Sequence, residues 1–389
     1  MRDGEQTPGV TFSPEEKLAI ASLMDEMGVP VMDVGIPVVS REETRAVKLI
    51  AGAGLQATVI AAARAVRRDV DACIECGVDE ISIFIACSEL HMKHKLRMTR
   101  EQVLEAAVRE VEYAKAHGLP VSFVTEDTFR ADMDYAVELY NACIDAGASR
   151  AVFCDTVGVM TPAAVSWFFS KIRPRLREVE LSFHGHNDFG LATANSLAAL
   201  EAGVAVPHVC VNGLGERSGN ASFEELVLTL ENLYEYDTGI DLSRLYELSR
   251  LVERFSGVPL GIHKPIVGYN AFSHESGIHA DGVIKHTATY EPIQPERIGR
   301  ERQFIFGKHT GSTVVVEKLR TRQVDATREQ VLQLVQLIKE HAESRLKDEQ
   351  QAFVELFRDR EERRRGVADE EFWMLARKAG IALPPDLGM

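Results

Sequence analysis

Residues 150–186 read RAVFCDTVGVMTPAAVSWFFSKIRPRLREVELSFHGH. Two short apolar runs, 150–156 and 180–186, stand on either side of a segment whose apolar residues have helical spacing. This pattern predicts a strand, a crossover helix and a second, parallel strand. Both runs end in polar side chains, and the second ends in two histidines, His184 and His186.

The same unit recurs from residue 14 to about residue 215, and its strand candidates are 29–36, 56–63, 80–86, 120–126, 150–156, 180–186 and 208–214. The stretch RDGEQ (2–6) stands where one more strand, the first, should end. Eight strands close a (β/α)8 barrel, whereas the alternative, a doubly wound sheet, usually carries a Gly-rich phosphate loop that this sequence lacks. We therefore predict an α/β fold, a TIM barrel with a truncated first strand. We expect about 8 to 15 residues upstream of Met1 to supply that strand.

Length and composition suggest one large domain with an appendage. A barrel takes roughly 250 residues, and the chain has 389. We expect the barrel at 1–262, a Gly-, His- and Pro-rich linker subdomain at 263–320 and a small helical region at 321–389. The net charge of −15 argues against a nucleic-acid partner. No apolar run of about 18 residues or signal sequence is visible, so we expect a cytoplasmic protein without membrane contact.

Polar side chains recur at the predicted C-terminal ends of the strands, which is where barrel enzymes have their active sites. His184 and His186, at i and i+2 of one strand, point to the same face and can share a metal ion. Two histidines with one carboxylate form a common open metal site. In a closed barrel the first strand is adjacent to the last one, which makes Asp3 the candidate carboxylate.

Eight motifs carry a resemblance to a known family: RDGEQ (2–6), FIACSELHMKHKL (84–96), TEDTFR (125–130), DTVG (155–158), HGHNDFGLATAN (184–195), NGLGERSGN (212–220), FSHESGIHADG (272–282) and FGKHTGS (306–312). The set resembles the isopropylmalate synthase and homocitrate synthase family. These are metal-dependent barrel enzymes that condense acetyl-CoA with a 2-oxo acid. The resemblance runs from residue 2 to about residue 315.

The resemblance implies a role for each matching residue. It implies metal ligation by Asp3, His184, His186 and, more weakly, Asn220. It implies catalytic roles for Arg2, Glu126, His279 and Tyr290, and a substrate contact for Thr156. From their positions in the sequence, we also expect Gln6, Arg64 and His91 to contact the substrate. His279 and Tyr290 would reach into the partner's barrel, so the resemblance also implies a homodimer. A divalent metal (Mg, Mn, Zn or Co) and acetyl-CoA as co-substrate follow from it.

The 2-oxo acid acceptor is left open by the sequence. About 70 residues after 321 are too few for a leucine-regulatory domain, which favours a short homocitrate synthase with 2-oxoglutarate as acceptor and Arg64 as the cation for its distal carboxylate. Residues 61–63 are small, whereas short homocitrate synthases tend to have bulkier residues before this arginine. A phosphonopyruvate-type acceptor, which would give phosphonomethylmalate or phosphinomethylmalate, is therefore our second choice. Isopropylmalate comes third. A metal-dependent acyl-CoA lyase or aldolase is the alternative of another class, and a non-catalytic binding role is a further one.

Overall fold

The computed structural model describes residues 1–344, 351–352, 354–355, 367, 369–379 and 381. The chain forms two compact units. The first comprises residues 1–271 and 295–301, and the second comprises 272–294 and 302–389. The domain boundaries expected at 262 and 320 remain a prediction. No helix of the described residues has the length and apolar character needed to cross a bilayer.

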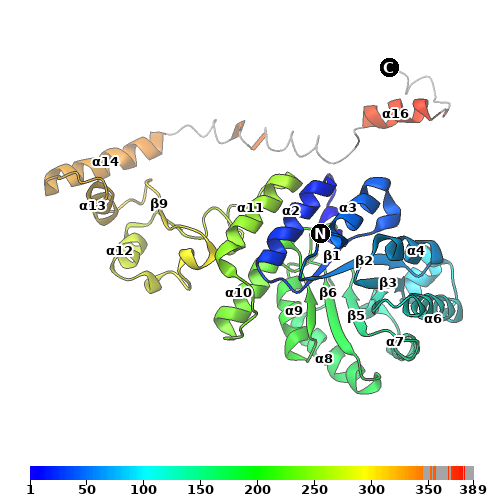
Figure 1. Ribbon diagram of the computed structural model, residues 1–389. Coiled ribbons are helices and arrows are strands. Elements are labelled where there is room, and N and C mark those ends of the chain that lie inside the picture. The colour runs from blue at the N-terminus through cyan, green and yellow to red at the C-terminus, as the bar shows by residue number, and fades with distance from the viewer. Residues whose placement is uncertain (345–350, 353, 356–366, 368, 380, 382–389) are drawn as a thin grey trace. The chain divides into compact units, whose positions relative to one another are not determined.

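A single parallel sheet of seven strands organises the first unit (Figure 1). Its strands are β1 (Val31–Gly35), β2 (Thr58–Arg64), β3 (Glu80–Ala86), β4 (Val121–Glu126), β5 (Arg150–Asp155), β6 (Glu180–Gly185) and β7 (Val206–His208). They pair in chain order from β1 to β7 without reversal. A doubly wound sheet reverses its strand order at a switch point, so this order confirms the prediction of a barrel-type sheet.

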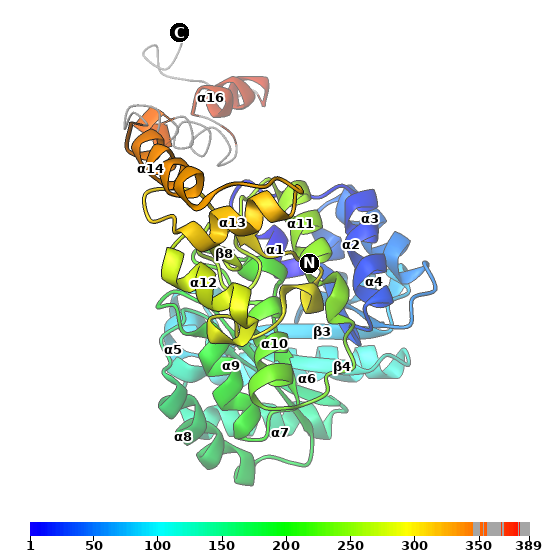
Figure 2. The ribbon, with the colours of Figure 1, turned by 90° about the vertical axis from the view of Figure 1, so that its left-hand side faces the viewer.

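Helices cover the outer face of the sheet, as Figures 1 and 2 show. They are α2 (Pro14–Glu26), α3 (Arg41–Ala51), α4 (Arg67–Cys76), α6 (Arg100–Ala116), α7 (Met133–Asp145), α8 (Pro162–Ile172), α9 (Ala192–Glu201), α10 (Phe223–Leu233) and α11 (Leu245–Ser256). Local capping fixes several of their starts: Ser13 and Glu16 form a capping box at α2, and Thr99 and Gln102 form another at α6. Each start is therefore set by the sequence next to it.

Side chains alternate between the two faces of each strand, which separates the core from the interior of the barrel. Phe123, Phe153 and Phe183 are fully buried on the outer face of β4, β5 and β6. The rings of Phe153 and Phe183 contact the aromatic residues of α8, and the ring of Phe123 joins this cluster through Tyr140 of α7. The residues next to these phenylalanines in each strand point to the other face and line the barrel interior. His184 follows Phe183, so it points into the barrel together with His186.

The last predicted strand, 208–214, is wrong in its extent, because β7 ends at His208. The chain then turns: Gly213 donates its N–H to the carbonyl of Cys210 at 2.9 Å, and Asn212 has a left-handed φ of 62°. Cys210 in turn donates to the carbonyl of Ala221 at 2.9 Å. This turn brings the NGLGERSGN segment back over the barrel end.

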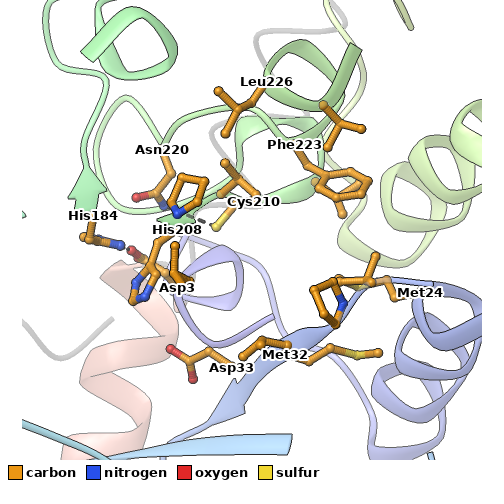
Figure 3. A pocket seen from close by; sticks show the side chains of 18 of the residues that line it. Asp3, Met24, Met32, Asp33, His184, His208, Cys210, Asn220, Phe223 and Leu226 are labelled. Atoms are coloured by element: carbon orange, nitrogen blue, oxygen red, sulfur yellow. Dashed lines mark hydrogen bonds and ion pairs between the residues drawn. The ribbon is translucent and has the colours of Figure 1, made fainter. Parts of the chain in front are cut away.

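The sheet does not close between β1 and β7, which stand at its two ends. A cavity of about 780 Å³ is lined by both of these strands and by helices around them. Figure 3 shows Met24, Met32, Phe223 and Leu226 along its apolar wall, with the polar residues Asp3 and His184 at another side. The cavity therefore lies at the open side of the sheet, between β1 and β7.

The second unit has its own small sheet and a set of helices. β8 (Ser273–His274) pairs in parallel with β9 (Gln303–Phe304). The helices are α12 (Gly277–Lys285), α13 (Ser312–Arg320), α14 (Arg328–Ser344) and α16 (Asp369–Lys378). Part of the predicted helical region at 321–389 falls on 345–350, 353, 356–366, 368, 380 and 382–389, which lie outside the described residues.

Candidate active site

Asp3, His184 and His186 form a buried cluster in which each side chain offers one metal-ligating atom. The Nε2 atoms of the two histidines are 3.2 Å apart. Asp3 Oδ2 is 3.1 Å from His184 Nε2 and 3.8 Å from His186 Nε2. Figure 3 shows Asp3 and His184 facing one another on the same side of the cavity. The structure thus brings together the three residues that the sequence predicts as ligands.

Unpartnered polar atoms indicate that this cluster is built for a cation. Asp3 Oδ1 and Asn220 Oδ1 are buried and accept no hydrogen bond. Asn220 uses its amide nitrogen to donate to the carbonyl of Leu214 at 2.9 Å, so its oxygen is free. An isolated β-bridge between Asn220 and His186 holds it beside the cluster. Since buried oxygens without partners are costly, the donor set fits a divalent metal held by Asp3, His184 and His186. Ligation by Asn220 stays a prediction.

The protonation states of the cluster suit metal ligation. Burial on its own would raise the pKa of Asp3, but the adjacent His184 and the charge of Arg2 outweigh it and hold that pKa well below its usual range. Burial, with a contribution from His184, lowers the pKa of His186 to about 4. A carboxylate and a neutral imidazole are the forms that bind metals, and both are favoured here before any ion binds.

Arg2 lies next to the cluster, held by acidic neighbours. Its Nε donates to Asp33 Oδ2 at 2.9 Å, and its Nη1 lies 3.6 Å from Asp3 Oδ2. Nη1 also donates to Gln6 Oε1 at 3.1 Å. The guanidinium is therefore fixed beside the metal ligands by Asp33 of β1, a residue that the sequence analysis did not single out. Asp33 could have been found from the sequence, because it is the one charged residue in the otherwise apolar strand β1.

The segment that carries Arg2 and Asp3 is the short helix α1 (Arg2–Glu5), and a buried lysine anchors it. Lys17 of α2 is fully buried, and its Nζ lies 2.5 Å from Glu5 Oε2 and 2.6 Å from Glu43 Oε2. Thr7 adds a second anchor, since its hydroxyl accepts the N–H of Gly215 at 2.8 Å. Sequence reasoning missed Lys17, although a lysine within the apolar stripe of an amphipathic helix is an available signal.

Glu126, the last residue of β4, stands at the level of the metal ligands. The register pairs Thr125 with Phe153, and Cys154 with His184. Glu126 and His184 are thus two strands apart at the same level, or about 10 Å between backbones at the usual strand spacing. Lys95 Nζ is 2.6 Å from both oxygens of Glu126, and His91 Nδ1 is 3.5 Å from one of them.

Thr156 and Arg217 connect neighbouring loops at this end of the barrel. Thr156 Oγ1 accepts the N–H of Asp127 at 2.8 Å, which leaves its own O–H free to donate. Arg217 donates to both carboxylate oxygens of Asp188, at 2.7 and 2.9 Å, and to the carbonyl of Thr156 at 2.6 Å. These hydrogen bonds to Arg217 also lower the pKa of Asp188. Arg217 links the loops that follow β5, β6 and β7.

Arg64, His279 and Tyr290 have contacts of their own. Arg64 ends β2 and donates two hydrogen bonds, at 2.6 and 2.9 Å, to the buried carboxylate of Asp69. His279 and Tyr290 belong to the second unit, where their exposed rings contact each other with centroids 4.2 Å apart. The predicted substrate role of Arg64 and the catalytic roles of His279 and Tyr290 therefore stay predictions.

Comparison with known proteins covers nearly the whole chain. The HMGL-like family matches residues 1–252, and the homocitrate synthase post-HMGL domain-like family matches 266–346. A putative (R)-citramalate synthase of Methanopyrus kandleri is 51% identical over 87% of this chain and 67% of its own length. A homocitrate synthase of the same organism is 47% identical over 92% of this chain and 90% of its own.

The chain is also similar to a 2-isopropylmalate synthase and to solved structures. A 2-isopropylmalate synthase of Methanocaldococcus jannaschii is 47% identical over 87% of this chain and 66% of its own. The crystal structure of an HMG-CoA lyase from Bacillus subtilis superposes with a TM-score of 0.61 at 23% identity, over 68% of this chain and 94% of that one. That likeness shows the fold alone. By the match over residues 1–252 and these relatives, the chain belongs to the HMGL-like family.

Proposed function

We propose that this protein condenses acetyl-CoA with a 2-oxo acid to give a 2-hydroxy polycarboxylate and free CoA. The buried cluster of Asp3, His184 and His186, with Arg2 beside it, is the observation that carries the proposal. Relatives at 46–51% identity are named as synthases of citramalate, isopropylmalate or homocitrate. A divalent ion held by the cluster would act as a Lewis acid towards the 2-oxo group.

The acceptor would be held by Arg2 and Thr156. Arg2 keeps a fixed guanidinium for the negative charge that develops on the carbonyl oxygen. Thr156 has a free O–H for the carboxylate of the acceptor. Both groups are positioned by hydrogen bonds before any substrate arrives, so little reorganisation is needed during the reaction.

Glu126 is our candidate for the acid–base work on acetyl-CoA. One methyl proton leaves to the base, and the resulting carbon forms a bond to C2 of the 2-oxo acid, whose oxygen takes up a proton. Water then cleaves the thioester and releases the CoA thiol. Glu126 and His184 stand at the same level of the sheet, two strands apart, so the base and the metal cluster can face the same pair of reactants.

Among acceptors, we place 2-oxoglutarate first, and hence homocitrate as the product. The homocitrate synthase relative is covered over 90% of its length, whereas the citramalate synthase is covered over 67% and the isopropylmalate synthases over 66% to 80%. The match of residues 266–346 to a homocitrate synthase domain points the same way. Phosphonopyruvate-type acceptors and then 2-oxoisovalerate remain the alternatives, and lyase or aldolase chemistry is the alternative of another class.

Acceptor screening tests the function directly. We expect thiol release from acetyl-CoA only when a 2-oxo acid and a divalent metal are both present, with 2-oxoglutarate the best of 2-oxoglutarate, 2-oxoisovalerate, oxaloacetate, pyruvate and phosphonopyruvate. A thiol reagent follows the release, and omission of the 2-oxo acid is the control. If no acceptor releases thiol with Mg, Mn, Zn or Co, the synthase proposal fails. Cleavage of 3-hydroxy-3-methylglutaryl-CoA in place of condensation would favour the lyase.

We further propose a homodimer in which His279 and Tyr290 complete the partner's site. Their exposed rings, which contact each other, support this assignment. Two inactive variants, Glu126→Gln and His279→Ala, are expected to recover part of the activity when mixed after dissociation, because a mixed dimer contains one site with neither substitution. Thiol release by the mixture is compared with that of each variant alone, and a mixture without any gain would contradict a shared site.

A further inference from the structure

We propose that Lys95 is a positioning residue that holds the Glu126 carboxylate in the orientation needed for proton transfer. The proposal rests on the proposed function and adds a group to its machinery. Lys95 Nζ lies 2.6 Å from Glu126 Oε1 and 2.6 Å from Oε2. A cation that contacts both oxygens fixes the plane of a carboxylate, which a single hydrogen bond does not. The carboxylate is thus oriented before substrate binds.

The loop that carries Lys95 is itself rigidly attached to the barrel. Ser88, fully buried, donates its O–H to Asp127 Oδ2 at 2.5 Å and accepts the N–H of His91 at 3.2 Å. Met92 is also buried, at 2% exposure. Asp127 follows Glu126 directly in the chain, so one short network fixes both the loop and the end of β4.

The local backbone of this loop is unusual in the way functional segments often are. Residues Met92–Leu96 form one turn of π-helix, and Arg97 closes it with a left-handed φ of 56°. Single π-helical turns occur frequently at functional sites. Here the turn places Lys95 over Glu126, while Lys93 of the same turn is solvent-exposed.

The Glu126 carboxylate has a second polar neighbour, His91, towards which it can turn when Lys95 is removed. His91 Nδ1 is buried without a hydrogen bond, 3.5 Å from Glu126 Oε1. Without Lys95, the carboxylate is free to rotate towards this unsatisfied nitrogen. We infer that the ammonium of Lys95 prevents that rotation, so that its removal changes the position of the base more than the stability of the fold.

The alternative interpretation is an ordinary surface ion pair. The Lys95 side chain is 52% exposed and that of Glu126 is 24% exposed, and such pairs contribute little to stability. Both interpretations predict an almost unchanged melting temperature when the pair is broken. They differ in kinetics, because only a positioning residue changes kcat.

The test compares Lys95→Met with Lys95→Arg and with Lys93→Met as the matched control. For Lys95→Met we expect kcat of thiol release to fall by about 100-fold, the effect of a displacement of about 1 Å at a reacting group. The KM of the acceptor should stay within about twofold, because the acceptor binds at the metal cluster. Lys95→Arg should recover most of the loss, and Lys93→Met should behave like the unsubstituted protein. Metal affinity and melting temperature, measured on each variant, verify that the fold and the metal cluster are intact.

The outcomes separate this inference from the proposed function. If the unsubstituted protein releases thiol and Lys95→Met has the same kcat, Lys95 is only a surface ion pair and the inference is overturned. An equal loss in Lys95→Met and Lys93→Met would overturn it too, since the effect would then be one of loop charge. If the unsubstituted protein releases no thiol with any acceptor, the proposed function has failed.

Discussion

Replacing His184 by alanine is expected to abolish both divalent-metal binding and thiol release. The substitution removes one of three ligands whose donor atoms lie within 4.8 Å of one another. A Lewis acid supplies several kcal/mol of transition-state stabilisation, so turnover should fall by about 1,000-fold or more. Isothermal titration with the metal alone measures binding, and the thiol assay measures turnover.

The melting temperature provides an independent readout of the same site. Metal at about 100 times its Kd should stabilise the unsubstituted protein by about 2.7 kcal/mol, and His184→Ala should lose that gain. His117→Ala, at an exposed histidine at the end of α6, is the matched control and should keep it. Asp3→Asn retains the side-chain volume but removes the charge, and should resemble His184→Ala. Full turnover or unchanged metal affinity in His184→Ala would refute the assigned site.

Lys17→Met is the second substitution for which we expect a large effect, although Lys17 touches neither metal nor substrate. Its ammonium is fully buried between Glu5 and Glu43 and lies 3.3 Å from the carbonyl of Val34. Removing it leaves two carboxylates facing each other in a confined space. Loss of one member of a buried charge network typically costs about 3–5 kcal/mol. Chemical denaturation should show a loss of that size.

Metal affinity should fall in the same variant, because Glu5 and the ligand Asp3 belong to the same turn of α1. The triple variant Lys17→Met, Glu5→Gln, Glu43→Gln removes the unpaired charges and should regain part of the stability. Lys48→Met, at an exposed lysine of α3, is the control and should change neither quantity. If Lys17→Met keeps both its stability and its metal affinity, the prediction is wrong, and the contacts of Thr7 and Arg2 are sufficient to hold α1 in place.

The order of the elements and the shared face of His184 and His186 could be predicted from the sequence, because both depend on short-range periodicity. Alternation with a period of two fixes the side of the strand to which His184 and His186 point. Apolar spacing near 3.6 residues identifies the crossover helices, and their capping residues are adjacent to them in the chain. These features need no knowledge of distant contacts, so the sequence by itself determined a parallel, barrel-type sheet with a metal cluster at one end.

The partners of individual charges were decided only by the tertiary structure. Arg64 pairs with Asp69, Lys95 with Glu126, and Lys17 with two glutamates of different helices. Thr7 reaches Gly215, a residue 208 positions away in the chain. Several pairings of opposite charges are compatible with one pattern, and choosing among them requires the strand register and the loop conformations. The sequence by itself determined that His184, His186 and other polar side chains stand at the ends of the strands, because strand periodicity is local. The packing of the chain decided which charges pair with each other and which polar atoms are left free to meet a metal or a substrate.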